Sequence, residues 1–280
     1  MPKNLSSSGQ TGPLSVGNVV SASLRIYRDH FKSYFGLAFV AYLWLLVPIY
    51  GSAKYSAILA LISRLAFGEV REKPETVSDA RREVNPRMWS FLGAGILTVL
   101  IYFGVSLVGG IAIAILAGGA TAIFGQNYVI ITALVVVAFI AFLIIYIRII
   151  SRLLIVELPL ASENNIGATS AIARSWELTK ESVGRIQWIF VVAFFISLPI
   201  TFVVQMLVVQ ILRLIVQSVL TAVLGAESPI IFVLVYYLLI LPFSFASGVL
   251  MTPFWQVIKA IIYYDLRSRK EGLDLQIRDR

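Results

Sequence analysis

Six long runs of apolar residues constrain the fold of this chain more than any other feature. They cover residues 34–50, 55–67, 88–116, 128–147, 186–206 and 229–262. Hydrophobic residues make up 59% of the chain and charged residues 14%, whereas soluble domains are roughly half apolar and about a quarter charged. We therefore predict an all-α fold, a polytopic membrane helix bundle with about six transmembrane helices plus amphipathic interfacial helices.

The first two runs are short for a full membrane crossing. At a rise of about 1.5 Å per residue, a helix of ~16 residues covers ~24 Å, less than the ~30 Å hydrocarbon core. The sequence therefore leaves open whether these runs cross fully or form a shallow re-entrant hairpin. Both arrangements return the chain to its starting side, so the predicted orientation of the later runs is the same.

Lysine and arginine predict that orientation. Of the 23 basic residues, all except Lys54 and Arg213 fall on one side of the membrane when the runs are threaded in order. By the positive-inside rule this side is the cytoplasm, so both termini are predicted to be cytoplasmic. Tyr263 and Tyr264, which precede a basic segment, are expected at the headgroup level where the last run ends.

Amphipathic segments precede the apolar pairs. In the first, apolar residues recur at helical spacing behind Ser15, the expected N-cap: Val16, Val20, Leu24, Tyr27 and Phe31. Such a helix is predicted to lie in the membrane interface.

Three such segments share a spacing in which an arginine follows one serine by four residues and precedes another by eight. The arginines are Arg25, Arg82 and Arg174. We predict a disordered cytoplasmic tail (1–14), a single membrane domain of three interfacial-helix and hairpin units (15–272), and a short cytoplasmic tail (273–280).

These three arginines are the predicted lipid-binding residues. Each basic residue near an anionic leaflet contributes roughly 1 kcal/mol to membrane binding. Membrane lipids, or a partner membrane complex at the cytoplasmic face, are therefore the expected partners. In the alternative interpretation these arginines only enforce topology.

A second hypothesis is a channel or permease for a small solute. Gln210, Arg213, Gln217 and Thr221 form a polar stripe that lies either on an outer-surface amphipathic helix or along a water-filled cavity. The six runs contain no carboxylate, which argues against a proton-driven carrier.

We predict that the protein is not an enzyme and has no catalytic residue, metal site or cofactor. It contains no cysteine, and its one histidine, His30, lies on the predicted polar face of the first amphipathic helix. The basic residues alternate with apolar runs, which argues against a nucleic-acid partner.

Small residues recur every four positions in the third run, at Ser106, Gly110, Ala114 and Gly118. Such a stripe lets another helix approach closely. That helix belongs either to the same chain or to a second copy in a homo-oligomer.

Three segments resemble a bacterial membrane family named for the glycerophosphoryl diester phosphodiesterase membrane domain, related to YciC-like integral membrane proteins. They are "PLSVGNVVSASLRIYRDHF" (13–31), "ARSWELTKES" (173–182) and "YYDLRSRKEGLDL" (263–275). The resemblance implies a six-helix membrane protein without the family's separate catalytic barrel, so that no catalytic residue carries over. It also implies a bacterial cytoplasmic membrane, with a thylakoid membrane as the alternative.

Overall fold

The structure, a computed structural model, describes residues 14–224 and 229–271. All secondary structure in this part of the chain is helical, which confirms the all-α prediction. Within it, four helices are long and apolar enough to cross a membrane, so the predicted number of six is not confirmed. The predicted terminal tails lie outside the described residues, apart from Leu14.

The helices range from short segments to continuous helices of more than forty residues. In chain order they are α1 (Val16–Asp29), α2 (Phe31–Trp44), α3 (Tyr50–Val70), α4 (Val77–Val84), the 3-10 turn η1 (Asn85–Arg87), α5 (Met88–Phe124), α6 (Tyr128–Leu153), α7 (Glu157–Ser162), α8 (Ala168–Thr179), α9 (Val183–Leu224) and α10 (Pro229–Glu271).

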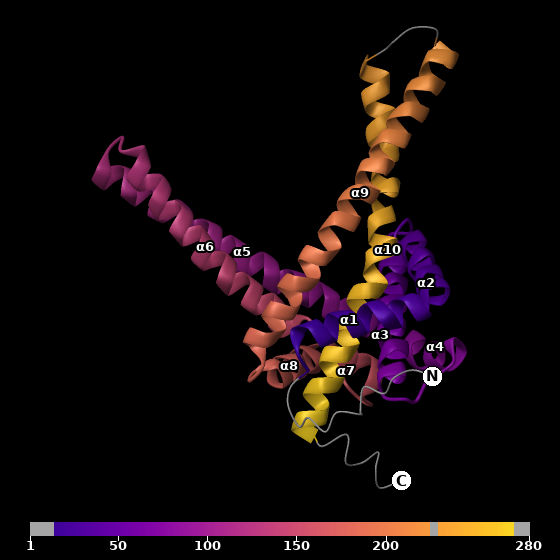
Figure 1. The fold of residues 1–280 in the computed structure, drawn as a ribbon. Coiled ribbons are helices and arrows are strands. Elements are labelled where there is room, and N and C mark those ends of the chain that lie inside the picture. Colours follow the sequence, from indigo (N-terminus) through magenta and orange to yellow (C-terminus); the bar gives the residue numbers. More distant parts are fainter. Residues whose placement is uncertain (1–13, 225–228, 272–280) are drawn as a thin grey trace.

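Two long antiparallel hairpins, α5/α6 and α9/α10, diverge from a common region (Figure 1). We call these hairpins the arms. The shorter helices α1, α2, α3, α4, α7 and α8 gather around the ends where the arms meet, and we call this region the base. Helices α9 and α10 have 42 and 43 residues, which corresponds to about 65 Å at 1.5 Å per residue.

The hydrophobic core lies in the base, around α3. This helix packs against α2, α4, α5, α7 and α10. Its small residues Ala53, Ala57, Ala60 and Ala66 are all buried and let these neighbours approach closely. Because more than half of its residues are buried, α3 is a core helix and not a lipid-facing one.

The α5/α6 arm has the opposite character. In the most apolar stretch of 18 residues within Val77–Phe124, no residue is buried. In the corresponding stretch within Tyr128–Ser162, only 6% of the residues are buried. The two helices pack closely at Gly109, where an added Cβ would lie 2.1 Å from Cε2 of Phe142. Apolar surface of this extent requires lipid or another protein to cover it.

The short helices precede the hairpins in the predicted order. Helix α1 precedes α2/α3, α4 precedes α5/α6, and α8 precedes α9/α10. Ser15 caps α1 as predicted, since its Oγ accepts a hydrogen bond from the Asn18 amide at 3.2 Å. Thr76 caps α4 in the same way through the amide of Asp79. The short helix α7 was not predicted, and it supplies part of the site described next.

Candidate functional site

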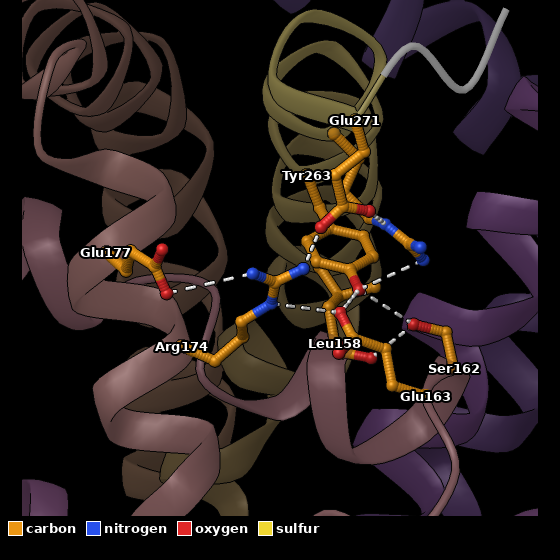
Figure 2. Close-up of polar contacts among 8 residues, drawn as sticks. Leu158, Ser162, Glu163, Arg174, Glu177, Tyr263 and Glu271 are labelled. Atoms are coloured by element: carbon orange, nitrogen blue, oxygen red, sulfur yellow. Dashed lines mark hydrogen bonds and ion pairs between the residues drawn. The ribbon is translucent and has the colours of Figure 1, made fainter.

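Arg174, one of the three predicted lipid-binding arginines, lies inside an ion-pair cluster of the base (Figure 2). From α8 its guanidinium pairs with Glu163 at 3.5 Å, with Glu177 at 3.7 Å and with Glu271 at the end of α10. We call this group, together with Tyr263, the Arg174 cluster. Three carboxylates surround one guanidinium, so the charge of Arg174 is compensated within the protein.

Tyr263 joins this cluster from α10. Its hydroxyl donates a hydrogen bond to Glu163 Oε1 at 2.6 Å and accepts one from Ser162 Oγ at 3.2 Å (Figure 2). The side chain is fully buried and packs on Phe67, with 5.1 Å between ring centroids. The expectation that Tyr263 lies among lipid headgroups is therefore wrong. Its hydroxyl has polar partners inside the protein, which is what makes burial favourable.

A second ionic centre surrounds Asp265, two residues further along α10. Its carboxylate pairs with Arg185 of α9 and with Arg269 at 3.2 Å, and it accepts the Leu14 amide at 3.2 Å. Only 8% of the Asp265 side chain is exposed. This carboxylate thus connects the start of α1, the start of α9 and the end of α10.

The three segments that carry the family resemblance meet at this end of α10. Besides the contacts above, Lys270 Nζ donates to the Glu177 carbonyl at 2.7 Å. Further back along α10, outside the third of these segments, the Tyr27 hydroxyl donates to the Leu250 carbonyl at 2.7 Å. Burial raises the pKa of Tyr27 to about 12. The charged residues that follow the last apolar run, within residues 263–271, therefore join several helices of the base.

Arg25 and Arg82 differ from Arg174. Both are exposed, Arg25 on α1 and Arg82 on α4, and neither has an acidic partner among the described residues. On the opposite faces of these helices, Val20 and Ala80 are buried. Arg25 and Arg82 are therefore uncompensated guanidinium groups at the surface of the base, as is Arg81 next to Arg82. The structure does not bring Arg25 and Arg82 together with Arg174.

The polar stripe on α9 is exposed along its length. Gln210, Arg213, Gln217 and Thr221 all face outward. Gln217 and Thr221 border a shallow hollow with Leu214, Ser218 and Ala222, all of them on α9. Gln210 and Arg213 do not line that hollow, so the described residues do not enclose the stripe in a cavity.

A partly buried polar network that was not predicted lies between α3, α7 and α10. Ser63 Oγ donates to Glu157 Oε1 at 2.6 Å and lies 2.9 Å from Gln256 Oε1. Lys259 Nζ donates to the other carboxylate oxygen of Glu157 at 3.2 Å. Ser63, Gln256 and Lys259 are polar residues within predicted apolar runs. Their occurrence there was the signal in the sequence that could have indicated this network.

Glu157 and Lys259 also border a cavity of about 300 Å³. The rest of its wall comes from α3, α5 and the end of α6 and is largely apolar: Ser56, Leu59, Phe91, Ala94, Gly95, Thr98, Val99, Tyr102, Leu153, Leu154 and Val156. Gly95 and Val99 are exposed, so the cavity opens at the surface of α5. We call it the Lys259 cavity.

His30 lies at the junction of α1 and α2. Its Nε2 lies 3.3 Å from Glu69 Oε1, and its Nδ1 lies 3.2 Å from the Ile26 carbonyl. The carboxylate partner was not predicted, because Glu69 is 39 positions away in the sequence. In the described part of the chain, no three histidine or acidic residues group as metal ligands would.

The small-residue stripe of α5 points away from its hairpin partner. Ser106, Gly110, Ala114 and Gly118 are exposed, and a Cβ added at either glycine would meet no atom within 4 Å. Within the described residues, the stripe therefore does not pack against another helix of this chain. Its use by a second copy stays a prediction.

Comparisons with known proteins identify no relative. No protein-family model matches the chain, and neither curated proteins nor solved structures gave a match. The family resemblance of the three segments stays a prediction.

Proposed function

We propose that the protein is a non-enzymatic integral membrane protein whose base binds anionic lipid at the cytoplasmic face. The observation that carries this proposal is the exposure of Arg25 and Arg82 without acidic partners. Each contributes roughly 1 kcal/mol of attraction to an anionic leaflet at low salt. The proposal gives Arg174 a structural role, because three carboxylates already compensate its charge.

The proposed setting is a bacterial cytoplasmic membrane with both termini on the cytoplasmic side. The α5/α6 and α9/α10 arms cross the membrane, and α2/α3 form a re-entrant hairpin. Helix α2 has 14 residues, about 21 Å, which is short for a crossing. Leu46 and Ile49, between α2 and α3, are exposed apolar residues suited to dip into the lipid.

Native mass spectrometry of the purified protein tests the lipid site. The double variant Arg25→Gln/Arg82→Gln is expected to retain fewer phosphatidylglycerol molecules than the parent protein, and added salt is expected to reduce the difference. The matched control is Lys54→Gln/Arg213→Gln, which removes the same charge from the predicted outer side. Equal phosphatidylglycerol retention in the two double variants would contradict the proposal.

A channel or permease is the alternative, and it has less support. Gln210, Arg213 and Gln217 are exposed on one helix and do not border a space enclosed by several described helices. Solute flux in proteoliposomes tests this function. A flux that the parent protein supports and Arg213→Ala abolishes would favour it over lipid binding.

A further inference from the structure

The Lys259 cavity combines a long apolar wall with one ion pair, formed by Lys259 and Glu157. On α5 its lining runs from Phe91 to Tyr102, eleven positions or about 16 Å along the helix axis. The hydrocarbon layer of one leaflet is about 15 Å deep, half of the ~30 Å core. Its volume of about 300 Å³ lies within the range of small-ligand sites, which are mostly apolar with few polar groups.

The contacts of Lys259 and Glu157 within the protein use only part of their hydrogen-bonding capacity. Lys259 Nζ carries three protons, and the contact with Glu157 uses one of them. The Glu157 carboxylate can accept about four hydrogen bonds, and Ser63 and Lys259 supply two. Two protons of the Lys259 ammonium and about two acceptor positions of the Glu157 carboxylate therefore remain free next to each other.

Depth and charge together identify a ligand class. An acyl chain fits the apolar wall of α5 and α3, whereas a purely anionic headgroup would meet the negative charge of Glu157. A headgroup that carries both charges satisfies both residues, with its phosphate at Lys259 and its ammonium at Glu157. We propose that the Lys259 cavity binds one zwitterionic phospholipid of the cytoplasmic leaflet, such as phosphatidylethanolamine, with one acyl chain along α5.

This site is separate from the proposed anionic-lipid contact. It involves neither Arg25 nor Arg82, and it selects a different headgroup. Loss of phosphatidylglycerol in the variants of those arginines therefore tests the earlier proposal alone, and loss of phosphatidylethanolamine in the variants below tests this one.

A cavity-filling substitution tests the inference without touching the ion pair. Gly95 lines the cavity, and an added Cβ there would meet no atom within 4 Å, so Gly95→Leu places its side chain in the open space. Gly104 is the matched control on the same helix. It is nine positions away, about two and a half turns, and therefore on the opposite face, and a Cβ there also has room.

The two variants and the parent protein are reconstituted in nanodiscs of mixed phosphatidylethanolamine and phosphatidylglycerol, and the retained lipids are identified by native mass spectrometry. We expect the parent and Gly104→Leu to retain phosphatidylethanolamine and Gly95→Leu to lose it. Lys259→Met is expected to lose it too. If Gly95→Leu does not fold, Thr98→Phe fills the same cavity one turn further along α5.

Equal retention of phosphatidylethanolamine in the folded cavity-filling variant and in Gly104→Leu would overturn the inference. Selective loss of phosphatidylglycerol from the cavity-filling variant would overturn the zwitterionic assignment. Retention that is unchanged by Lys259→Met would also do so, because the phosphate contact would then be unnecessary.

Discussion

The base and the α5/α6 arm are held together in different ways. In the base, ion pairs around Arg174 and Asp265 join helices that are distant in sequence, and α3 is buried on most sides. In the arm, α5 and α6 contact each other and leave most of their apolar surface exposed. The base therefore carries its own tertiary structure, whereas the arm depends on its surroundings to cover it.

Removing the Asp265 carboxylate is expected to have the largest effect on the base. Asp265→Ala leaves Arg185 and Arg269 without their common partner in a largely buried position. We expect a loss of about 3 kcal/mol or more in the free energy of unfolding. Unfolding of detergent-solubilised protein by denaturant, followed by circular dichroism, measures it.

Asp29→Ala is the control for this substitution. Asp29 pairs with Arg28 on the exposed face of α1, where ion pairs contribute ~1 kcal/mol or less. Similar losses in the two variants would show that the base does not depend on its buried carboxylate.

The arm is expected to respond next most strongly, to a change in side-chain size. Gly109→Leu forces a side chain against Phe142 and should separate α5 from α6, at a cost of about 1–3 kcal/mol. Gly110→Leu, one position along, points into open space and should be tolerated. Hydrogen exchange of α6 amides compares the two variants. Equal protection in both would mean that contact between the helices does not order the arm.

A smaller effect is expected at Tyr27, which links α1 to α10. Its pKa is raised to about 12 from 10. A raised pKa means that the folded state holds the proton more tightly, so the contribution is present below about pH 10 and is lost toward pH 12. Tyr27→Phe removes a hydrogen bond worth about 1 kcal/mol near neutral pH.

Thermal unfolding across this pH range measures the Tyr27 effect. The difference between the parent protein and Tyr27→Phe should shrink between pH 10 and pH 12. A constant difference would assign the effect of the substitution to packing and not to the hydroxyl proton.

The smallest perturbation comes from single cysteines, which report on which side of the membrane each region lies. The chain has no native cysteine, so introduced ones are labelled specifically. Glu72→Cys in the base and Gln126→Cys at the tip of the α5/α6 arm are both at exposed positions. In intact cells an impermeant reagent should label only Gln126→Cys. Labelling of Glu72→Cys would invert the proposed topology.

The sequence predicts the helices better than it predicts their contacts. The apolar runs gave the helical class and the positions of the arms, and Ser15 gave the start of α1. The number of membrane-crossing helices was not confirmed, because hydropathy alone cannot distinguish a lipid-facing run from the buried α3. The burial of Tyr263 was not predicted either, because it depends on contacts with residues far away in the sequence, such as Phe67.

For the candidate sites, too, the sequence predicted single residues better than the contacts between them. Arg25 and Arg82 are exposed in the structure, but Arg174 is paired with carboxylates that include Glu271, almost 100 positions away. Glu157 and Lys259 were not predicted as a pair for the same reason. Pairings of this kind depend on how the hairpins pack together, and local spacing carries no information about that packing.

The divergence of the two arms has a consequence for the membrane itself. Because the arms point in different directions, no single axis is parallel to both (Figure 1). In a flat bilayer at least one arm must therefore be tilted, which lets a helix longer than the ~30 Å core remain in hydrocarbon. Lipids between the arms would occupy a wedge that widens away from the base.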